Sequence, residues 1–189
     1  MRTRSLAVIL AGVCLVCVAP ARAANQLTNP DFATDLSGWL TATWPVVQTG
    51  SQGFTAPGAA QATATSPSGA LGGVALRQCT TATAGTLYDF GGMFKIDPTS
   101  TTTGGASINV TWYSAPGCST VISQDTVAAS NAVGWQTLAT SATAPAGTAS
   151  ALLDLVQSVD NTGTFQAFWD DIYIGPHPTP VELTGFAAE

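Results

Sequence analysis

The fold of this chain is set by the segment NQLTNPDFATDLSGW, residues 25–39. It begins with a short strand-like run and then breaks at an Asn-Pro pair. Phe32 and Trp39 are its apolar anchors, and the residues between them are turn formers that can hydrogen-bond their own backbone. A segment of this kind needs a partner strand, which FQAFWDDIYI, residues 165–174, can supply. We therefore expect a β-sandwich whose first and last strands lie side by side.

Residues 1–23 have the features of a secretory signal peptide. Two arginines precede an apolar run over residues 6–18, and an Ala-Arg-Ala site follows. The run is too short to remain in a bilayer as an anchor. We expect cleavage after Ala23, a β-sandwich domain over residues 24–175, and a proline-containing tail over residues 176–189.

The charge balance of the mature chain excludes two classes of partner. Arg77 and Lys95 remain against eleven acidic residues after cleavage, which gives a net charge of −9. Nucleic-acid binding depends on Lys and Arg neutralising phosphates, and binding to anionic lipid also needs basic clusters. We expect no nucleic-acid partner and no membrane anchor, and we expect the protein to be released to the periplasm or the medium.

Two cysteines remain after cleavage, Cys79 and Cys118. In an oxidising compartment these residues are expected to form one disulfide that closes a long loop. A metal site would need more ligands than two cysteines in a chain with one histidine.

Alternating apolar and polar residues predict strands along most of the chain. The clearest case is YDFGGMFKI, residues 88–96, which places Tyr88 and Phe90 on one face and Asp89 and Lys95 on the other. No stretch has a convincing helical repeat. Eight or nine short strands at hairpin spacing indicate an all-β, antiparallel β-sandwich or jelly roll.

Four motifs occur in a recognisable order: NQLTNPDF…LSGW, ALRQC…AGTLYDFGGMFKI, GWQTLATSATAP and FWDDIYI. This order resembles the jelly-roll carbohydrate-binding modules of the family four, nine, sixteen and twenty-two type, which belong to the galactose-binding-like fold. The resemblance covers residues 25–174. It implies a non-catalytic domain whose ligand is a polysaccharide or another glycan.

The resemblance also implies a structural calcium ion (Ca2+) where the opening turn meets the closing Asp-Asp pair. Asp170 matches the usual side-chain ligand, and Asp31 and Asp35 lie on either side of Ala33, where the family has an acid. Carboxylate and backbone oxygens suit a hard cation at this junction. The alternative is that Asp170 only caps backbone amides in the turn.

A sugar-binding face needs aromatic platforms beside polar side chains. We expect exposed aromatic surface at Trp44, which precedes a proline, and at Tyr113, which has the outward phase of its strand. Arg77, Asp89 and Asn109 share the outward phase of successive strands and could line a groove with them. These residues could equally be ordinary exposed residues of a sheet. Three other tryptophans have the phase of the core: Trp39, Trp112 and Trp135.

No set of residues predicts catalysis. His177 is the only histidine and lies in a proline-rich tail. Asp170 and Asp171 are adjacent in a strand, so we expect them to point to opposite faces and to make a poor acid–base pair. We expect a secreted carbohydrate-binding module-like protein that is not an enzyme. The alternative is an extracellular structural or adhesion domain with the same fold and no sugar ligand.

Overall fold

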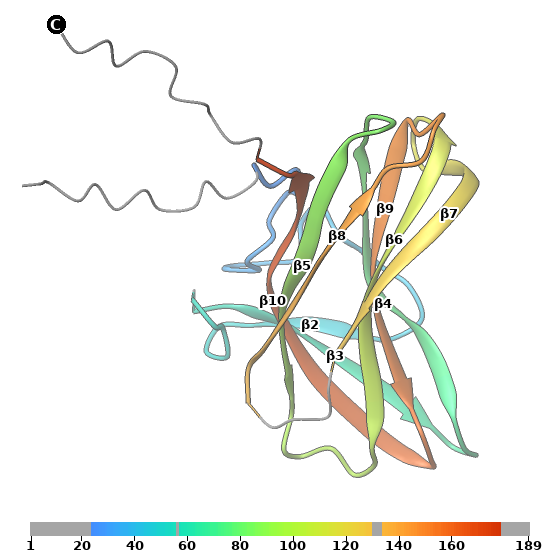
Figure 1. Cartoon of the computed structure of the whole chain (residues 1–189). Helices are drawn as coiled ribbons and strands as arrows, with labels where there is room; N and C mark the ends of the chain where they lie inside the picture. Colours follow the sequence, from blue (N-terminus) through green and yellow to red (C-terminus); the bar gives the residue numbers. More distant parts are fainter. Residues whose placement is uncertain (1–23, 56, 130–133, 179–189) are drawn as a thin grey trace, which may run out of the picture.

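Two five-stranded antiparallel sheets pack face to face in the computed structural model, which describes residues 24–55, 57–129 and 134–178 (Figure 1). The described part of the chain contains no helix. The signal peptide predicted for residues 1–23 and the tail beyond residue 178 lie outside the described residues. The strands are β1 (Leu40–Thr41), β2 (Val46–Thr49), β3 (Ala59–Ser66), β4 (Leu71–Thr81), β5 (Leu87–Ile96), β6 (Gly104–Ala115), β7 (Ser119–Ala128), β8 (Gln136–Thr143), β9 (Ser150–Val159) and β10 (Gly163–Pro176).

The strand order places the last strands of the chain at the centre of each sheet. Sheet A has the order β1-β4-β9-β6-β7, and sheet B has the order β2-β3-β10-β5-β8. Every neighbouring pair is antiparallel. The expected antiparallel β-sandwich is therefore confirmed, with ten strands rather than eight or nine. Strand β2, which follows the Trp44-Pro45 pair, is an edge strand, as is usual for a strand beside a proline.

The core lies between the sheets because one face of each strand is apolar. Strand β5 turns Tyr88, Phe90 and Phe94 inward, as its alternation predicted. The rings of Tyr88 and Trp112 lie 5.5 Å apart, and those of Phe94 and Trp169 lie 4.9 Å apart. The first pair joins sheet B to sheet A, and the second joins two strands of sheet B. Burial of such rings is the main stabilising term of the sandwich.

The opening segment bridges the two sheets. On one side, Gln26 donates its backbone N–H to the carbonyl of Ile174 on β10 (2.9 Å). On the other side, the side-chain amide of Gln78 on β4 accepts from Thr28 N (2.6 Å) and donates to Thr28 O (3.0 Å). The two chain ends thus lie side by side, although residues 24–39 form turns rather than a first strand. Phe32, buried completely, anchors this segment with Trp39 at a ring distance of 5.3 Å.

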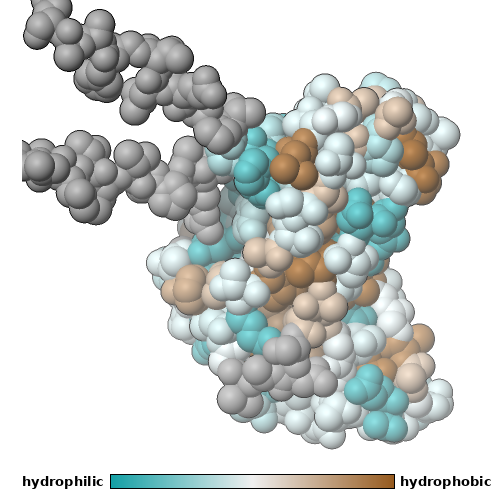
Figure 2. Space-filling model, in the orientation of Figure 1, coloured by the Kyte–Doolittle hydropathy of each residue, from teal (hydrophilic) through white to brown (hydrophobic). Residues whose placement is uncertain are grey.

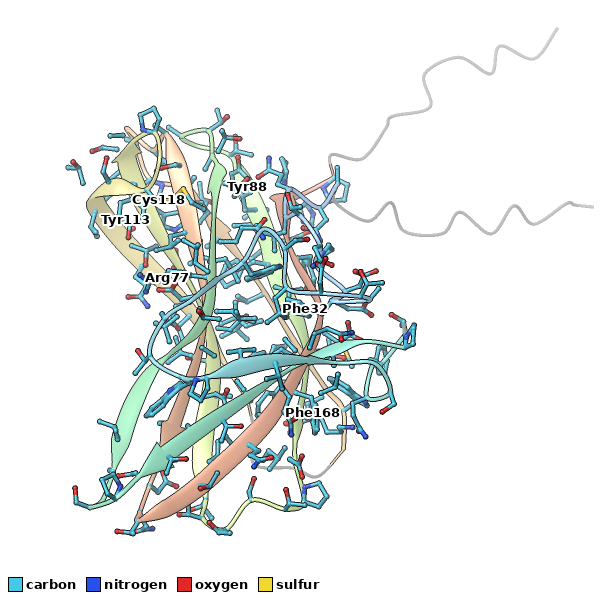
Figure 3. All side chains as sticks on the ribbon, turned by 180° about the vertical axis from the view of Figure 1, so that it is seen from behind. Phe32, Arg77, Tyr88, Tyr113, Cys118 and Phe168 are labelled. Carbon is cyan, nitrogen blue, oxygen red and sulfur yellow. A yellow bond between two sulfur atoms is a disulfide. The ribbon has the colours of Figure 1, made fainter. Side chains whose placement is uncertain are left out.

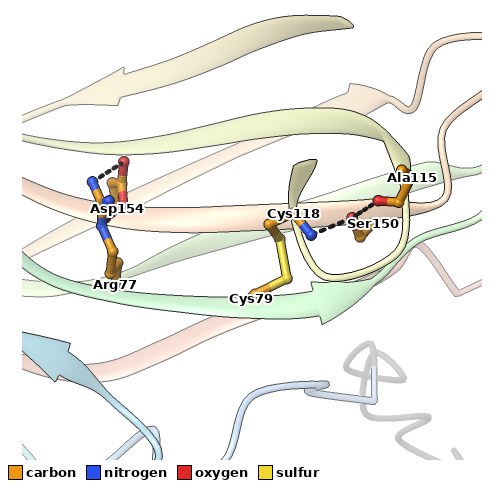
Figure 4. The surroundings of a disulfide bond; sticks show 6 residues. All are labelled: Arg77, Cys79, Ala115, Cys118, Ser150 and Asp154. Atoms are coloured by element: carbon orange, nitrogen blue, oxygen red, sulfur yellow. Dashed lines mark hydrogen bonds and ion pairs between the residues drawn. A yellow bond between two sulfur atoms is a disulfide. The ribbon is translucent and has the colours of Figure 1, made fainter. Parts of the chain in front are cut away.

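The disulfide between Cys79 and Cys118 is formed as predicted, with a Cα–Cα distance of 6.1 Å. It joins β4 to the turn between β6 and β7, across the end of sheet A (Figure 4). Ser150 supports that turn, because its hydroxyl accepts from Cys118 N (3.0 Å) and donates to Ala115 O (2.7 Å).

We predict that the double variant Cys79→Ser, Cys118→Ser is markedly less stable than the parent. The bridge closes a loop of 39 residues, and the chain-entropy model assigns such a loop about 4 kcal/mol of stabilisation. For a domain of this size that corresponds to a fall in melting temperature of roughly 10 °C. Calorimetry measures the difference, and equal melting temperatures would show that the bridge does not stabilise the fold.

Candidate functional site

The outer face of sheet B carries small and apolar residues on its strands β5 and β8. Figure 2 looks onto the edge of the sandwich where β7 and β8 lie, and it shows apolar residues near the middle of that edge, surrounded by pale and hydrophilic residues. Met93, Gly91 and Ala139 are neighbours on the outer face of sheet B. They point outward because the residues of opposite parity in β5 and β8, such as Phe94 and Leu138, are buried in the core. Gly91 must be a glycine, since an added Cβ would lie 2.0 Å from the carbonyl oxygen of Leu138. The middle of the face therefore carries small or apolar side chains and no charge at these three positions.

Four side chains form what we call the aromatic cluster of sheet B: Phe54, Lys95, Trp135 and Phe168. The rings of Phe54 and Trp135 meet edge to face at 5.8 Å. The ammonium of Lys95 lies 4.9 Å from the centre of the Trp135 ring and 4.6 Å from that of Phe168. Phe54 keeps 48% of its surface exposed, whereas Phe168 keeps only 4%. The cluster thus offers Phe54 and the half-buried Trp135 to solvent, with Phe168 as their floor.

The loop between β2 and β3 is fastened to a bulge in β10, and this brings Phe54 over the sheet. Asp170 accepts the backbone N–H of Phe54 (2.6 Å), and Asp171 accepts the hydroxyl of Thr55 at 2.8 Å to each oxygen. The pairing of β10 with β5 gains one residue between Asp170 and Tyr173, and Asp171 has a φ of 47°. The expectation that the two carboxylates point to opposite faces is wrong, because the bulge turns Asp171 toward the same loop.

Burial governs the ionisation of the inner carboxylate of this pair. Asp170 is completely inaccessible to solvent. This burial raises its pKa above the ordinary value, and the neighbouring charge of Asp171 raises it further, while the N–H groups of Phe54 and Asp171 lower it in part. The loop is therefore held by a carboxyl group that two backbone donors satisfy inside the protein.

The structure separates the residues expected to bind a ligand. Trp44 is not exposed: only 6% of it reaches solvent, and its indole N–H donates to the carbonyls of Gly73 (3.1 Å) and Gln157 (3.3 Å). That expectation is wrong because the proline after Trp44 forces a strand edge, and the ring turns inward to find these acceptors. Asp89 lies on sheet B, near the start of β5, whereas Lys95 of the aromatic cluster lies near its end.

The other three predicted ligand residues lie on the outer face of sheet A. Arg77 pairs across the sheet with Asp154, and Asp154 pairs with Asn109, so the three form one row. Arg77 also makes an ion pair with Asp154 (3.2 Å). Tyr113 lies four residues further along β6 on the same face. Figure 3 shows Arg77 and Tyr113 on the side of the sandwich away from Phe168, so no single groove unites the predicted set.

Asp89 holds the end of β10 rather than facing a cleft. It accepts from Ser141 Oγ (2.6 Å) and contacts Nδ1 of His177 (2.8 Å). Partial burial raises the pKa of Asp89, but the hydrogen bonds and the nearby imidazole outweigh burial and hold that pKa below its usual range. In a catalytic triad the histidine lies between the serine and the carboxylate. Here Ser141 and His177 each contact the carboxylate of Asp89, so the histidine is not placed as a base for the serine. The arrangement therefore gives no support to a catalytic role.

The three predicted calcium ligands do not form a metal site. No group of three or more His, Cys, Asp or Glu side chains that could hold a metal occurs in the described ranges. Asp35 is an exposed cap whose pKa is lowered by the backbone N–H of Ser37, and both oxygens of Asp170 already accept backbone N–H groups. Asp31 does not complete a group of three such side chains with Asp35 and Asp170 in the described ranges. The alternative weighed for Asp170, that it caps backbone amides, is what its contacts show.

An amide of this chain contacts two backbone carbonyls of the opening turn, where the resemblance implied a cation ligand set. The carbonyl oxygens of Phe32 and Ala33 both accept from Nε2 of Gln48, at 3.1 and 3.2 Å. The chain is packed tightly there, since a Cβ on Gly58 would lie 2.1 Å from the oxygen of Phe32. Two converging carbonyls attract either a hard cation or a hydrogen-bond donor, and this chain supplies the donor itself. The residues present therefore do not fit the expected calcium ion.

We predict that Gln48→Glu makes the fold depend on calcium, whereas the parent is equally stable in chelator and in roughly millimolar calcium. A carboxylate against two carbonyls loses the hydrogen bonds and adds repulsion, at a cost of about 1–3 kcal/mol in chelator. A cation could relieve that repulsion. Melting temperatures of both proteins measure the effect. A parent that is several degrees more stable in calcium would contradict the account.

The sequence patterns did not point to the aromatic cluster, although two of its residues carry a signal. Trp135 was expected to have the phase of the core, and this expectation is wrong. Trp135 and the buried Leu138 have opposite strand parity, so Trp135 points away from the core. Phe168 likewise has the opposite parity to Trp169. Phe54 is an aromatic residue in a loop of Gly, Ser, Gln and Thr, and nothing local in the sequence shows where that loop folds.

Several solved structures have the same fold. The chain matches "Family 16 Carbohydrate Binding Module-2" at 16% identity and a TM-score of 0.58, covering 79% of this chain and 99% of that one. It matches the CBM22-1 xylan-binding domain from Paenibacillus barcinonensis Xyn10C at 16% identity and a TM-score of 0.57, covering 86% and 100% of the two chains. This chain shares the jelly-roll fold of carbohydrate-binding modules. The resemblance found in the four sequence motifs is thereby confirmed for the fold.

The fold also occurs in a different setting. The enzymatically active domain of bacteriophage CBA120 tailspike protein 4 matches at 13% identity and a TM-score of 0.58, over 80% of this chain and 21% of the tailspike chain. At these identities the likeness shows the fold alone. No protein-family model matches the sequence, and no curated protein matches it. Within the described residues, no helix is long and apolar enough to cross a membrane.

Proposed function

We propose that this domain binds polysaccharide without catalysis, through the outer face of sheet B. The observation that carries the proposal is the aromatic cluster, in which Phe54 and Trp135 reach the surface beside Lys95. Sugar rings have apolar C–H faces that pack on aromatic side chains, while their hydroxyl groups need polar partners nearby. The solved structures of similar fold that are titled as carbohydrate-binding modules support the same function.

Polar side chains beside the cluster supply the partners that a sugar requires. Gln61 on β3 and Gln166 on β10 are joined by a side-chain hydrogen bond (3.0 Å), and Gln61 also donates to Asp97 (3.1 Å). Gln61 pairs across the sheet with Phe168, so its amide lies next to the floor of the aromatic cluster. Amides at the edge of an aromatic patch can donate to and accept from sugar hydroxyls at the same time.

The proposal includes a location outside the cytoplasm. The disulfide between Cys79 and Cys118 suits an oxidising compartment, and the first 23 residues have the composition of a signal peptide. Most carbohydrate partners of such a fold would also be met outside the cell.

A second function, adhesion without a sugar ligand, is favoured by one observation. The edge strand β7 of sheet A exposes Val121 to 63% and Ile122 to 37%. An edge strand with exposed apolar side chains is suited to contact with another protein. The pair is small beside the aromatic cluster, so polysaccharide binding is the function that the geometry supports best.

We predict that Trp135→Ala and Phe54→Ala each weaken polysaccharide binding about tenfold, because each removes an aromatic contact worth about 1.4 kcal/mol. Tyr113→Ala is the matched control, since it removes an aromatic side chain from the opposite sheet. Affinity electrophoresis against a panel of neutral and acidic polysaccharides measures the change.

Loss of binding with Tyr113→Ala and not with Trp135→Ala would place the site on sheet A instead. If the parent bound none of the polysaccharides, the adhesion function would replace sugar binding.

A further inference from the structure

Lys95 is a cation without an anionic partner. The described part of the chain contains two Lys or Arg residues, and Arg77 is paired with Asp154. Lys95 has no carboxylate oxygen within 4.0 Å among the described residues. Its ammonium instead donates to Oε1 of Gln52 (3.1 Å) and lies over the rings of Trp135 and Phe168. A half-buried charge is thus held in place without being neutralised.

The contacts of Lys95 fix its position and leave hydrogen-bonding capacity free. An ammonium has three N–H donors, and Gln52 accepts one of them. Contact with two aromatic faces orients the charge through their quadrupoles but leaves its net value unchanged. The rings also limit the motion of a side chain that would otherwise lose much rotamer freedom on binding a ligand. Lys95 is therefore prepared to receive an anionic group at the centre of the aromatic cluster.

The carboxylates nearest in the sheet are engaged elsewhere. Asp89 accepts from Ser141, and Asp97 accepts from Gln61 and from both N and Oγ1 of Thr99. Asp170 and Asp171 hold the loop that carries Phe54. Each acid has its own donors, so the protein offers Lys95 no counter-ion.

We propose that the ligand of sheet B is an acidic polysaccharide, and that Lys95 pairs with the carboxylate of a uronic-acid unit. This inference rests on the proposed function and names the ligand class of that site. A uronic acid combines an apolar ring face, which packs on Phe54 and Trp135, with a carboxylate in the same unit for Lys95. A neutral sugar fills the first requirement and leaves the charge unpaired.

The negative charge of the whole domain does not prevent this pairing. Exposed charges separated by more than about 8 Å are largely screened at physiological ionic strength. The ammonium of Lys95 meets a bound carboxylate in direct contact, at a distance where partial burial strengthens the attraction. The remaining acids lower the rate of encounter more than the strength of the bound state.

The test uses one polymer in two charge states, polygalacturonate and its fully methyl-esterified form, with the mature chain in about 0.15 M salt. The parent is expected to bind the acid form about tenfold more tightly than the ester. Lys95→Gln should remove this preference, and Lys95→Arg should retain most of it. Arg77→Gln, with the same loss of charge on sheet A, should leave the preference unchanged. Melting curves check that each variant is folded.

The outcomes separate this inference from the proposed function. Equal binding of acid and ester forms by the parent, with Lys95→Gln unchanged, would overturn the uronic-acid inference and leave sugar binding intact. Loss of preference in Arg77→Gln as well as in Lys95→Gln would assign the effect to net charge and overturn the role of Lys95. If the parent bound neither form nor any neutral polysaccharide, the proposed function itself would fail.

Discussion

Strand β10 buries aromatic rings on both of its faces. Its inner face packs Phe165, Ala167 and Trp169 into the core, while Phe168 points outward from the middle of sheet B. A large ring in that position cannot be left open to water without cost. The loop after β2 covers it, and the bulge at Asp170 supplies the carboxylate that holds the loop. Covering this one strand therefore creates the aromatic surface that we assign to the ligand.

The two sheets have different tasks. The outer face of sheet A carries a paired charge row, with Arg77 and Asp154 neutralising each other. The outer face of sheet B carries a cation without a carboxylate partner among aromatic rings, and Gly91 leaves room there for the carbonyl of Leu138 and the hydroxyl of Tyr173. The amide of Gln48 joins the opening turn to strand β2 through two hydrogen bonds. In the function that we propose, sheet B carries the binding face, while sheet A and the disulfide support the fold.

The alternation of apolar residues was sufficient to predict the fold, because each strand follows a period of two and the turns are marked by Gly, Pro and Asn. The same alternation predicted the inward rings of Tyr88 and Phe90. It could not predict the candidate site, since the loop bearing Phe54 has no period and nothing in the alternation marks the bulge at Asp170 that holds this loop. Trp44 was misplaced because its burial depends on two carbonyl acceptors remote in the sequence.

The central claim is that the ligand binds at the aromatic cluster of sheet B, and the five tryptophan indoles provide a direct test. Four of them, those of Trp39, Trp44, Trp112 and Trp169, donate to acceptors inside the protein. We would titrate 15N-labelled protein with polygalacturonate oligosaccharides and follow the indole N–H signals by NMR. We expect the Trp135 signal to move and the other four to remain in place. If the indole signal of Trp135 stayed in place while the backbone amide signals of Arg77, Asn109 and Tyr113 shifted, the claim would be contradicted.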